Sequence, residues 1–174
     1  MKLLDFPRLR QTYDYDCGAK SLQSALAYYG IEVREDYVMK FAHTCKTGTP
    51  ITGIEKTIKK YGLKYESREM TVEEIKSSID KEIPVIVVLQ AWAKRKVNWK
   101  KDWKDGHYVV VIGYNSKGFI FEDPSSFERT SLTYGEFKKR WHDVSSEGKR
   151  YVHYGISVFG KKPKYDSKKI VKMR

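Results

Sequence analysis

Residues 107–123 read HYVVVIGYNSKGFIFED, and this stretch decides the fold. Two apolar runs, 107–114 and 119–123, flank the turn-forming tetrapeptide Asn-Ser-Lys-Gly. Apolar runs of this length, bounded by turn residues, predict two antiparallel strands of one hairpin. The run IPVIVVLQAW at residues 83–92 predicts another buried strand, and residues 151–159 predict a last one. The second half of the chain is therefore expected to form an antiparallel sheet.

The first half of the chain has helical spacing instead. In residues 17–29 the apolar side chains recur three or four positions apart, and Gly30 follows as a stop. Threonine N-caps with a glutamate three residues later predict more helices. These helices are expected at 52–61, 71–80 and 133–141, where they begin with Thr52, Thr71 and Thr133. Another helix is expected at 35–43. Helices followed by an antiparallel sheet indicate the α+β class.

Length and composition exclude several classes of protein. The 174 residues suit one domain, expected at residues 1–160, followed by a basic tail at 161–174. A hydrophobic share of 40% with 14% aromatic residues excludes a disordered chain. The mean hydropathy of −0.63 and the lack of a long apolar run exclude a membrane span. No secretory signal is visible and there are only two cysteines, so we expect a cytoplasmic protein.

The positive charge is concentrated in two segments. Lysine and arginine number 34 against 22 acidic residues, and the excess lies in the tail and in the loop 94–104. Tryptophans 92, 99 and 103 are interleaved with the charges of this loop. One interpretation is weak contact with nucleic acid or an anionic surface through loop and tail. The other is a solvated loop whose tryptophans pack on the edge of the domain.

Cys17 is the first candidate for chemistry, because it lies where a loop is expected to enter the helix of residues 17–29. Unpaired N–H groups and the positive end of the helix dipole favour the thiolate, which is the nucleophilic form of cysteine. The next residue, Gly18, leaves space beside the sulfur. The alternative is that Cys17 is a small hydrophobe that only packs.

Three more residues could support a nucleophilic thiol. His107 begins one strand of the predicted hairpin and Asp123 ends the other, so both are expected at the end opposite the turn. A histidine there can serve as base, and a carboxylate can orient it. Gln11, six residues before Cys17, is a candidate oxyanion donor together with the backbone N–H of Cys17. Each residue also has an interpretation without a catalytic role. His107 could be a solvated histidine at a strand end, Asp123 a turn residue before proline, and Gln11 a solvated glutamine.

Cys45 is interpreted as an inert packed cysteine. The alternative is a regulatory disulfide with Cys17, since Cys45 follows a predicted helix and lies close to Gly48 in the sequence. His43 and Cys45 together are too few ligands to predict a metal site. The sequence therefore assigns chemistry to Cys17 and not to Cys45.

Three segments together resemble the bacteriocin-processing peptidase family. They are QTYDYDCG at 11–18, GHYVVVIG at 106–113 and EDP at 122–124, in the order Gln, Cys, His, Asp. The resemblance extends over roughly residues 8–160. Members of this family are papain-like cysteine peptidases, best known as the N-terminal domain of peptide-exporting ABC transporters, where they cut leader peptides after a double glycine.

The resemblance implies a papain-like fold in which the nucleophile helix packs on an antiparallel sheet. It also implies a role for each candidate residue: Cys17 as nucleophile, His107 as general base and later acid, Asp123 as the group that orients His107, and Gln11 in the oxyanion hole. The expected partner is a peptide or protein substrate. No metal or organic cofactor is expected.

The chain differs from the transporter type in its basic, tryptophan-rich loop and its basic tail, and we expect it to act as a standalone domain. Two alternatives to a peptidase stay open. An amidase or acyl transferase could use the same triad, because the acyl-enzyme needs only a different acceptor. A binding module could retain the scaffold without catalysis, although the presence of Cys17, His107, Asp123 and Gln11 argues against it.

Overall fold

The computed structural model describes residues 1–174 and contains five helices and nine strands. The helices are α1 (Cys17–Tyr28), α2 (Glu35–Phe41), α3 (Ile51–Lys60), α4 (Val72–Asp80) and α5 (Tyr134–Arg140). The strands are β1 (Lys2–Leu3), β2 (Lys64–Glu69), β3 (Val85–Gln90), β4 (Gly106–Tyr114), β5 (Gly118–Glu122), β6 (Thr130–Thr133), β7 (His142–Val144), β8 (Arg150–Val152) and β9 (Tyr154–Phe159).

Seven strands form one antiparallel sheet in the order β2-β9-β3-β4-β5-β6, with β1 also paired to β4. The predicted hairpin is confirmed as β4 and β5, in which Val110 lies opposite Glu122. This register brings the start of β4 and the end of β5 to the same end of the sheet. The α+β class is confirmed.

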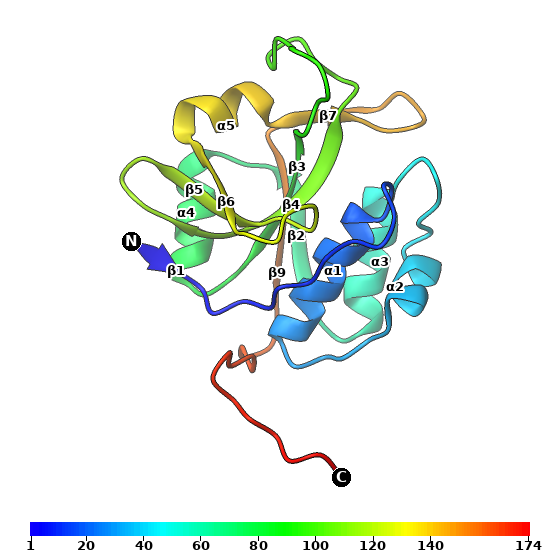
Figure 1. Cartoon of the computed structure of the whole chain (residues 1–174), viewed down its shortest axis with the longest axis vertical. Coiled ribbons are helices and arrows are strands. Elements are labelled where there is room, and N and C mark those ends of the chain that lie inside the picture. The colour runs from blue at the N-terminus through cyan, green and yellow to red at the C-terminus, as the bar shows by residue number, and fades with distance from the viewer.

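The helices cover the sheet in separate groups. In Figure 1, α1, α2 and α3 gather at the right of the sheet, and α5 lies beside β5 and β6 at the upper left. Helix α1 buries its apolar residues, among them Ala19, Leu22 and Leu26, as the spacing predicts. At the N-terminus of α1, Gly18 packs against the ring of Tyr108, close to the start of β4.

Two of the three predicted capping boxes are confirmed, and one is wrong. Thr71 and Thr133 each accept a hydrogen bond from the backbone N–H three residues later, and Glu74 and Glu136 complete the boxes. Helix α3 begins at Ile51 instead, with Pro50 at its N-cap and no side-chain cap. Proline lacks an N–H that the first turn would leave unpaired, so it fits this helix start.

The predicted strand at residues 151–159 is divided at His153, which has a φ of 52°. Backbone hydrogen bonds hold this left-handed residue, since its N–H donates to the carbonyl of Trp141 and its carbonyl accepts from Met70. The chain therefore changes sheets here. Strand β8 pairs with β7 in a separate two-stranded sheet, and β9 enters the main sheet between β2 and β3.

Both ends of the chain contact the domain. The N-terminal segment expected to be a lead-in supplies β1 and buries Leu4 and Phe6 in the core. In the tail, the backbone N–H groups of Lys164 and Tyr165 donate to the Tyr28 carbonyl at 3.0 and 3.1 Å. The tail thus continues along the domain at least to Tyr165, and the boundary after residue 160 stays a prediction.

The basic loop between β3 and β4 is folded onto the domain. Arg95 pairs with Asp102 and Asp105, and the Asp102 side chain is buried. The Trp99 ring lies 3.9 Å from the guanidinium of Arg140, and the ring of Trp103 lies 4.5 Å from that of His142. These two rings are half-buried and pack against other side chains of the domain. The structure gives no support to a nucleic-acid contact through this loop.

Candidate active site

Cys17 is the first residue of α1, and Asp16 prepares the loop that leads into it. The buried carboxylate of Asp16 accepts backbone hydrogen bonds from Thr12 at 2.9 Å and Tyr13 at 3.1 Å. It makes no capping bond to the N-terminus of α1. The first-turn N–H groups of a helix have no partner within the helix, so this end of α1 leaves its amides and its positive dipole end to the Cys17 side chain.

Gly18 allows α1 to approach the sheet closely. A β-carbon at this position would lie 2.7 Å from Cβ of Thr49 and 2.9 Å from the Tyr108 ring. Both neighbours are fixed, because the Tyr108 hydroxyl donates to the Thr49 carbonyl at 2.7 Å. Glycine is therefore required for packing against Tyr108 and Thr49, and not only for space beside the sulfur as the sequence predicts.

His107 is the second residue of β4 and is only 6% exposed. Its Nε2 lies 2.8 Å from Oδ1 of Asp123. Burial opposes the charged imidazole, but hydrogen bonds with Asp123 and with the Cys17 thiol outweigh it and raise the pKa of His107 to about 9. Since Nε2 is engaged by Asp123, Nδ1 is the ring nitrogen left for Cys17. The sequence-predicted Cys17, His107 and Asp123 are thus brought together.

The carboxylate of Asp123 is held on both oxygens. Oδ1 accepts the backbone N–H of Ser125 at 2.9 Å as well as the imidazole, and Oδ2 accepts the indole N–H of Trp92 at 3.1 Å and the Thr130 hydroxyl at 3.4 Å. Burial raises the pKa of Asp123, but its bonds to His107 and to the other donors lower it further than burial raises it. The group beside the imidazole is therefore a fixed, charged carboxylate.

Gln11 is tied to the segment that follows Asp123. Its backbone N–H donates to the Pro124 carbonyl at 3.0 Å, and its Oε1 accepts the Ser125 hydroxyl at 2.8 Å. Its Nε2 donates one hydrogen to the Tyr13 carbonyl at 2.7 Å. An amide nitrogen carries two hydrogens, so a second one is available to a ligand.

Three further residues contribute to the site, and no local sequence pattern predicts their roles. Trp92 donates to Asp123 from a backbone position with a φ of 61°, a strained conformation for a bulky residue. Arg10 forms an ion pair with the buried Glu122 at 2.7 Å. Because these two residues precede Gln11 and Asp123, their pair fastens together the two segments that carry the site.

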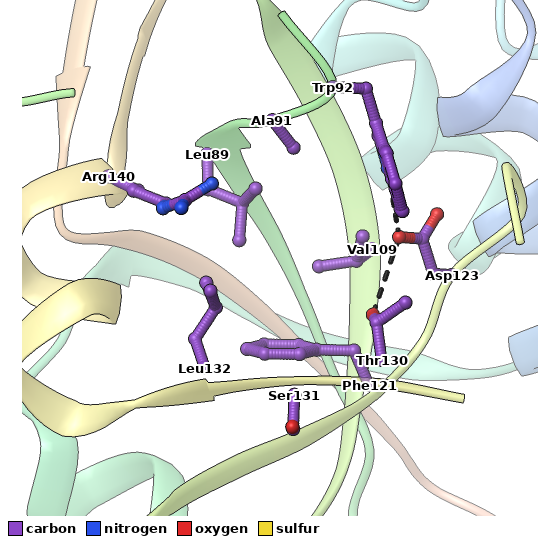
Figure 2. A pocket seen from close by; sticks show the side chains of 10 residues that line it. All are labelled: Leu89, Ala91, Trp92, Val109, Phe121, Asp123, Thr130, Ser131, Leu132 and Arg140. Carbon is purple, nitrogen blue, oxygen red and sulfur yellow. Dashed lines mark hydrogen bonds between the residues drawn. The ribbon is translucent and has the colours of Figure 1, made fainter. Parts of the chain in front are cut away.

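A pocket of about 340 Å³ adjoins the site at Asp123. Figure 2 shows Trp92 and Asp123 at one end of it, joined by their hydrogen bond, and Arg140 at the other end. The pocket is lined mainly by apolar side chains, and its residues are Leu89, Ala91, Trp92, Val109, Phe121, Asp123, Thr130, Ser131, Leu132 and Arg140. Such a pocket can receive a side chain of a peptide bound at Cys17.

The second thiol has a different environment. Cys45 is exposed, so the prediction that it is a packed cysteine is wrong, and both cysteines are free in the structure. A hydrogen bond from the Thr47 hydroxyl, at 3.1 Å, lowers the pKa of Cys45. No histidine or carboxylate hydrogen-bonds to its sulfur.

No group of three or more His, Cys, Asp and Glu side chains is arranged to hold a metal ion. None of the helices has the length and apolar character needed to cross a membrane.

Comparison with known proteins identifies the family of this chain. The family model described as "Peptidase C39 family" matches residues 5–146. The pediocin PA-1 transport/processing ATP-binding protein PedD of Pediococcus acidilactici is 25% identical over 136 residues, which is 78% of this chain and 17% of PedD. The chain therefore spans about a sixth of the length of this curated relative.

Solved structures match over most of the chain. The peptidase domain of Streptococcus ComA, a bifunctional ABC transporter of a quorum-sensing pathway, is 25% identical with a TM-score of 0.67, covering 88% of this chain and 97% of that one. A double glycine motif protease from an AMS/PCAT transporter, solved with a leader peptide, is 21% identical with a TM-score of 0.67, covering 93% and 94%. With its match to the family model over most of its length, the chain belongs to the C39 peptidase family, a family of cysteine peptidases.

Proposed function

We propose that this C39 family protein hydrolyses a peptide bond with Cys17 as nucleophile, His107 as general base and acid, and Asp123 as the residue that orients His107. The observation that carries the proposal is the place of His107 between two groups: its Nε2 lies 2.8 Å from Oδ1 of Asp123, and the neighbouring Cys17 thiol contributes to its raised pKa. A base must come within hydrogen-bond reach of the group that it deprotonates. The raised pKa of His107 favours the imidazolium, the form that can give a proton to the leaving group.

These three residues and a water molecule account for each proton and bond of the reaction. The Cys17 thiolate attacks the carbonyl carbon, and the C–N bond breaks as His107 gives its proton to the leaving nitrogen. The resulting thioester is then attacked by a water molecule, whose proton passes to His107, and the C–S bond breaks to restore the thiolate. Asp123 balances the positive charge of the imidazolium throughout.

Gln11 supports the oxygen of the tetrahedral intermediate. Its second Nε2 hydrogen and the first-turn amides of α1 are the donors proposed for this oxyanion. The loop bonds to Pro124 and Ser125 hold the amide rigidly, and preorganised donors are the ones that lower a barrier. In this arrangement Gln11 depends on the Asp123 segment, so the oxyanion hole and the triad are positioned together.

For the substrate we propose a leader peptide that ends in two glycines. One structural relative is described as a double glycine motif protease and was solved with a leader peptide, and PedD is described as a transport/processing protein. We place the protein in the cytoplasm, because both thiols are free and a reducing compartment would keep the Cys17 thiol reduced. Residues 1–160 are proposed as the catalytic domain and 161–174 as a tail.

The proposal is tested with a synthetic leader-like peptide that contains a Gly-Gly-Ala sequence. Mass spectrometry should detect cleavage after the second glycine. Cys17→Ala should abolish turnover, whereas Cys45→Ala, the matched control, should not change it. A peptide aldehyde ending in glycine should form an adduct with Cys17. Full activity in Cys17→Ala, or cleavage of small amides and not of peptides, would contradict the proposal.

A further inference from the structure

The loop of residues 11–16 carries the Gln11 amide to the N-terminus of α1. Its first residue is anchored to Pro124 and Ser125. The Nε2 group of Gln11 also donates to the carbonyl of Tyr13 at 2.7 Å, within the loop itself. The direction of the second Nε2 hydrogen therefore depends on where the loop lies relative to α1.

Glu35, the first residue of α2, contacts both the loop and α1. Its Oε2 accepts the hydroxyl hydrogen of Thr12 at 2.6 Å and lies 3.1 Å from Nζ of Lys20. Lys20 belongs to the first turn of α1, and its side chain is only 9% exposed. Helix α2 packs beside α1 (Figure 1). One carboxylate oxygen on α2 thus links the loop of the proposed oxyanion donor to the helix of the proposed nucleophile.

The orientation of Glu35 is not that of an ordinary acidic residue at a helix start. Asp36 also lies in the first turn of α2, where a negative charge favours the helix. The Asp36 side chain bonds to Arg34 and is 61% exposed, whereas that of Glu35 is 20% exposed. An exposed carboxylate would serve the helix equally well. The inward orientation of Glu35 therefore points to its contacts with Thr12 and Lys20.

This orientation has an electrostatic cost. Oε1 of Glu35 is buried without a donor, which is unfavourable for a carboxylate. The carboxyl group of Asp16 also lies nearby: burial and the bond with Glu35 raise the pKa of Asp16 to about 6. Burial raises the pKa of Glu35 as well, but its bonds with Asp16, Thr12 and Lys20 lower it further. Glu35 is therefore a charged group held in place against the loop.

We infer that Glu35 is a positioning residue for the oxyanion hole: through its bond to Thr12 it holds the loop of residues 11–16 against α1 and so orients the Gln11 amide. The inference rests on the proposed peptidase function and adds to it a residue that acts through Gln11. Because an oxyanion forms only as the reaction proceeds, a donor to it acts on the transition state. Loss of Glu35 should lower kcat and kcat/KM equally and leave KM unchanged.

Steady-state kinetics with the double-glycine peptide gives the first test. Glu35→Ala should lower kcat about tenfold, because the Gln11 amide remains but is no longer held in place. Asp36→Ala, the matched control in the same turn, should keep the wild-type kcat. In a Gln11→Ala background, Glu35→Ala should have no further effect, since residues that act through one interaction are not additive. Additive losses, or a loss confined to KM, would overturn the inference.

A second variant breaks the same bond from the loop side. Thr12→Val removes the hydroxyl but leaves the ion pair of Glu35 with Lys20 intact, so it decides the question if Glu35→Ala does not fold. Its kcat should match that of Glu35→Ala, and Thr12→Ser, which restores a hydroxyl, should recover the wild-type value. A wild-type kcat in Thr12→Val would show that the bond does not position Gln11.

Hydrogen exchange separates this inference from the proposed function, because it needs no turnover. The backbone N–H groups of Thr12 and Tyr13 donate to Asp16. They should exchange about tenfold faster in Glu35→Ala and in Thr12→Val than in the wild type or in Asp36→Ala. If the wild type cuts no peptide, the peptidase proposal fails, and faster exchange still shows that Glu35 holds the loop. Unchanged exchange in both variants would refute the inference even if the peptide is cut.

Discussion

Two buried histidines of this protein make similar hydrogen bonds in different electrostatic settings. His107 and His142 are each 6% exposed, and each lies at the start of a strand. Nε2 of His107 lies 2.8 Å from a carboxylate oxygen of Asp123, whereas Nε2 of His142 lies 2.6 Å from the backbone carbonyl of Asp102. The carboxylate of Asp102 is bonded to Arg95 instead.

The difference shows what a histidine needs to act on a thiol. A carboxylate carries a full charge that stabilises the imidazolium, whereas a carbonyl only accepts the N–H. His107 has a thiol on its other side, but the ring of His142 is covered by Trp103 at 4.5 Å. Burial and a hydrogen bond alone therefore do not distinguish a candidate base from a structural histidine; the charge of the acceptor and the neighbouring thiol do.

The largest expected effect separates the two histidines by activity. His107→Ala should lower kcat/KM for a double-glycine peptide by roughly 10³ or more, because both the base and the acid are lost. His142→Ala should stay within about threefold of the wild type after correction for the folded fraction, since its ring faces Trp103 and a carbonyl. Equal losses in the two variants would break the comparison.

A smaller loss is expected when the carboxylate becomes an amide. Asp123→Asn keeps the size of the side chain but removes the charge that stabilises the imidazolium, so kcat should fall on the order of 10². Gln11→Ala should lower kcat by about the same factor through the loss of one oxyanion donor. Steady-state kinetics at fixed pH measures both. A loss confined to KM would argue against these roles.

The pH dependence of stability tests the same contrast without turnover. The pKa of His107 is raised from 6.5 to about 9 in the folded protein. Its stabilising contribution is therefore complete below about pH 6.5 and is lost as the pH rises to about 9, for a fall of a few kcal/mol in the free energy of unfolding. Urea unfolding from pH 6 to 9.5 should show this slope. Asp123→Asn should flatten it, and His142→Ala should not.

A change of several fold is expected at Trp92, which supports Asp123 from the rim of the pocket. Trp92→Phe retains a ring but removes the N–H that donates to Oδ2. Because Trp92 is 57% exposed, water can replace part of that bond, and kcat should fall only about threefold to tenfold. Trp92→His, whose ring N–H can donate to Asp123 in place of the indole, should recover part of the lost kcat. A wild-type kcat in Trp92→Phe would remove Trp92 from the positioning network.

The smallest effect is expected on the structural histidine. Trp103→Leu removes the ring that packs on His142 and should lower the free energy of unfolding by about 1 kcal/mol. The kcat/KM should be unchanged. If activity fell with stability intact, the loop between β3 and β4 would be part of the catalytic machinery, and the contrast between the two histidines would be weaker than their hydrogen bonds indicate.

Local patterns predicted much of the fold. The hairpin of β4 and β5 and the capping boxes at Thr71 and Thr133 follow from turn residues and from contacts three positions apart. The division of the last strand at His153 does not, because its left-handed backbone is held by Trp141 and Met70, which are distant in the sequence. The amino-acid pattern of a strand does not show that the chain leaves one sheet and enters another within that segment.

The candidate site, too, was predictable only where local geometry determines it. The pairing of His107 with Asp123 follows from hairpin geometry, since the start of one strand meets the end of the next. Trp92 could not be assigned, because its bond to Asp123 joins residues 31 positions apart and requires a φ that tryptophan rarely adopts. The ion pair of Arg10 with Glu122 spans 112 positions and has no local signature.

Gly18 lets the N-terminus of α1, which carries Cys17, pack closely against Thr49 and Tyr108. A single methyl group there would collide with Thr49 and with the Tyr108 ring at under 3 Å, and the helix would have to back away from the sheet. The sulfur would then retreat from the imidazole by a fraction of an ångström or more, although no reactive group had been altered. Gly18→Ala should thus give a protein that keeps its thiol, imidazole and carboxylate and can still bind a peptide. In this variant only the distance between the Cys17 sulfur and the His107 ring is changed.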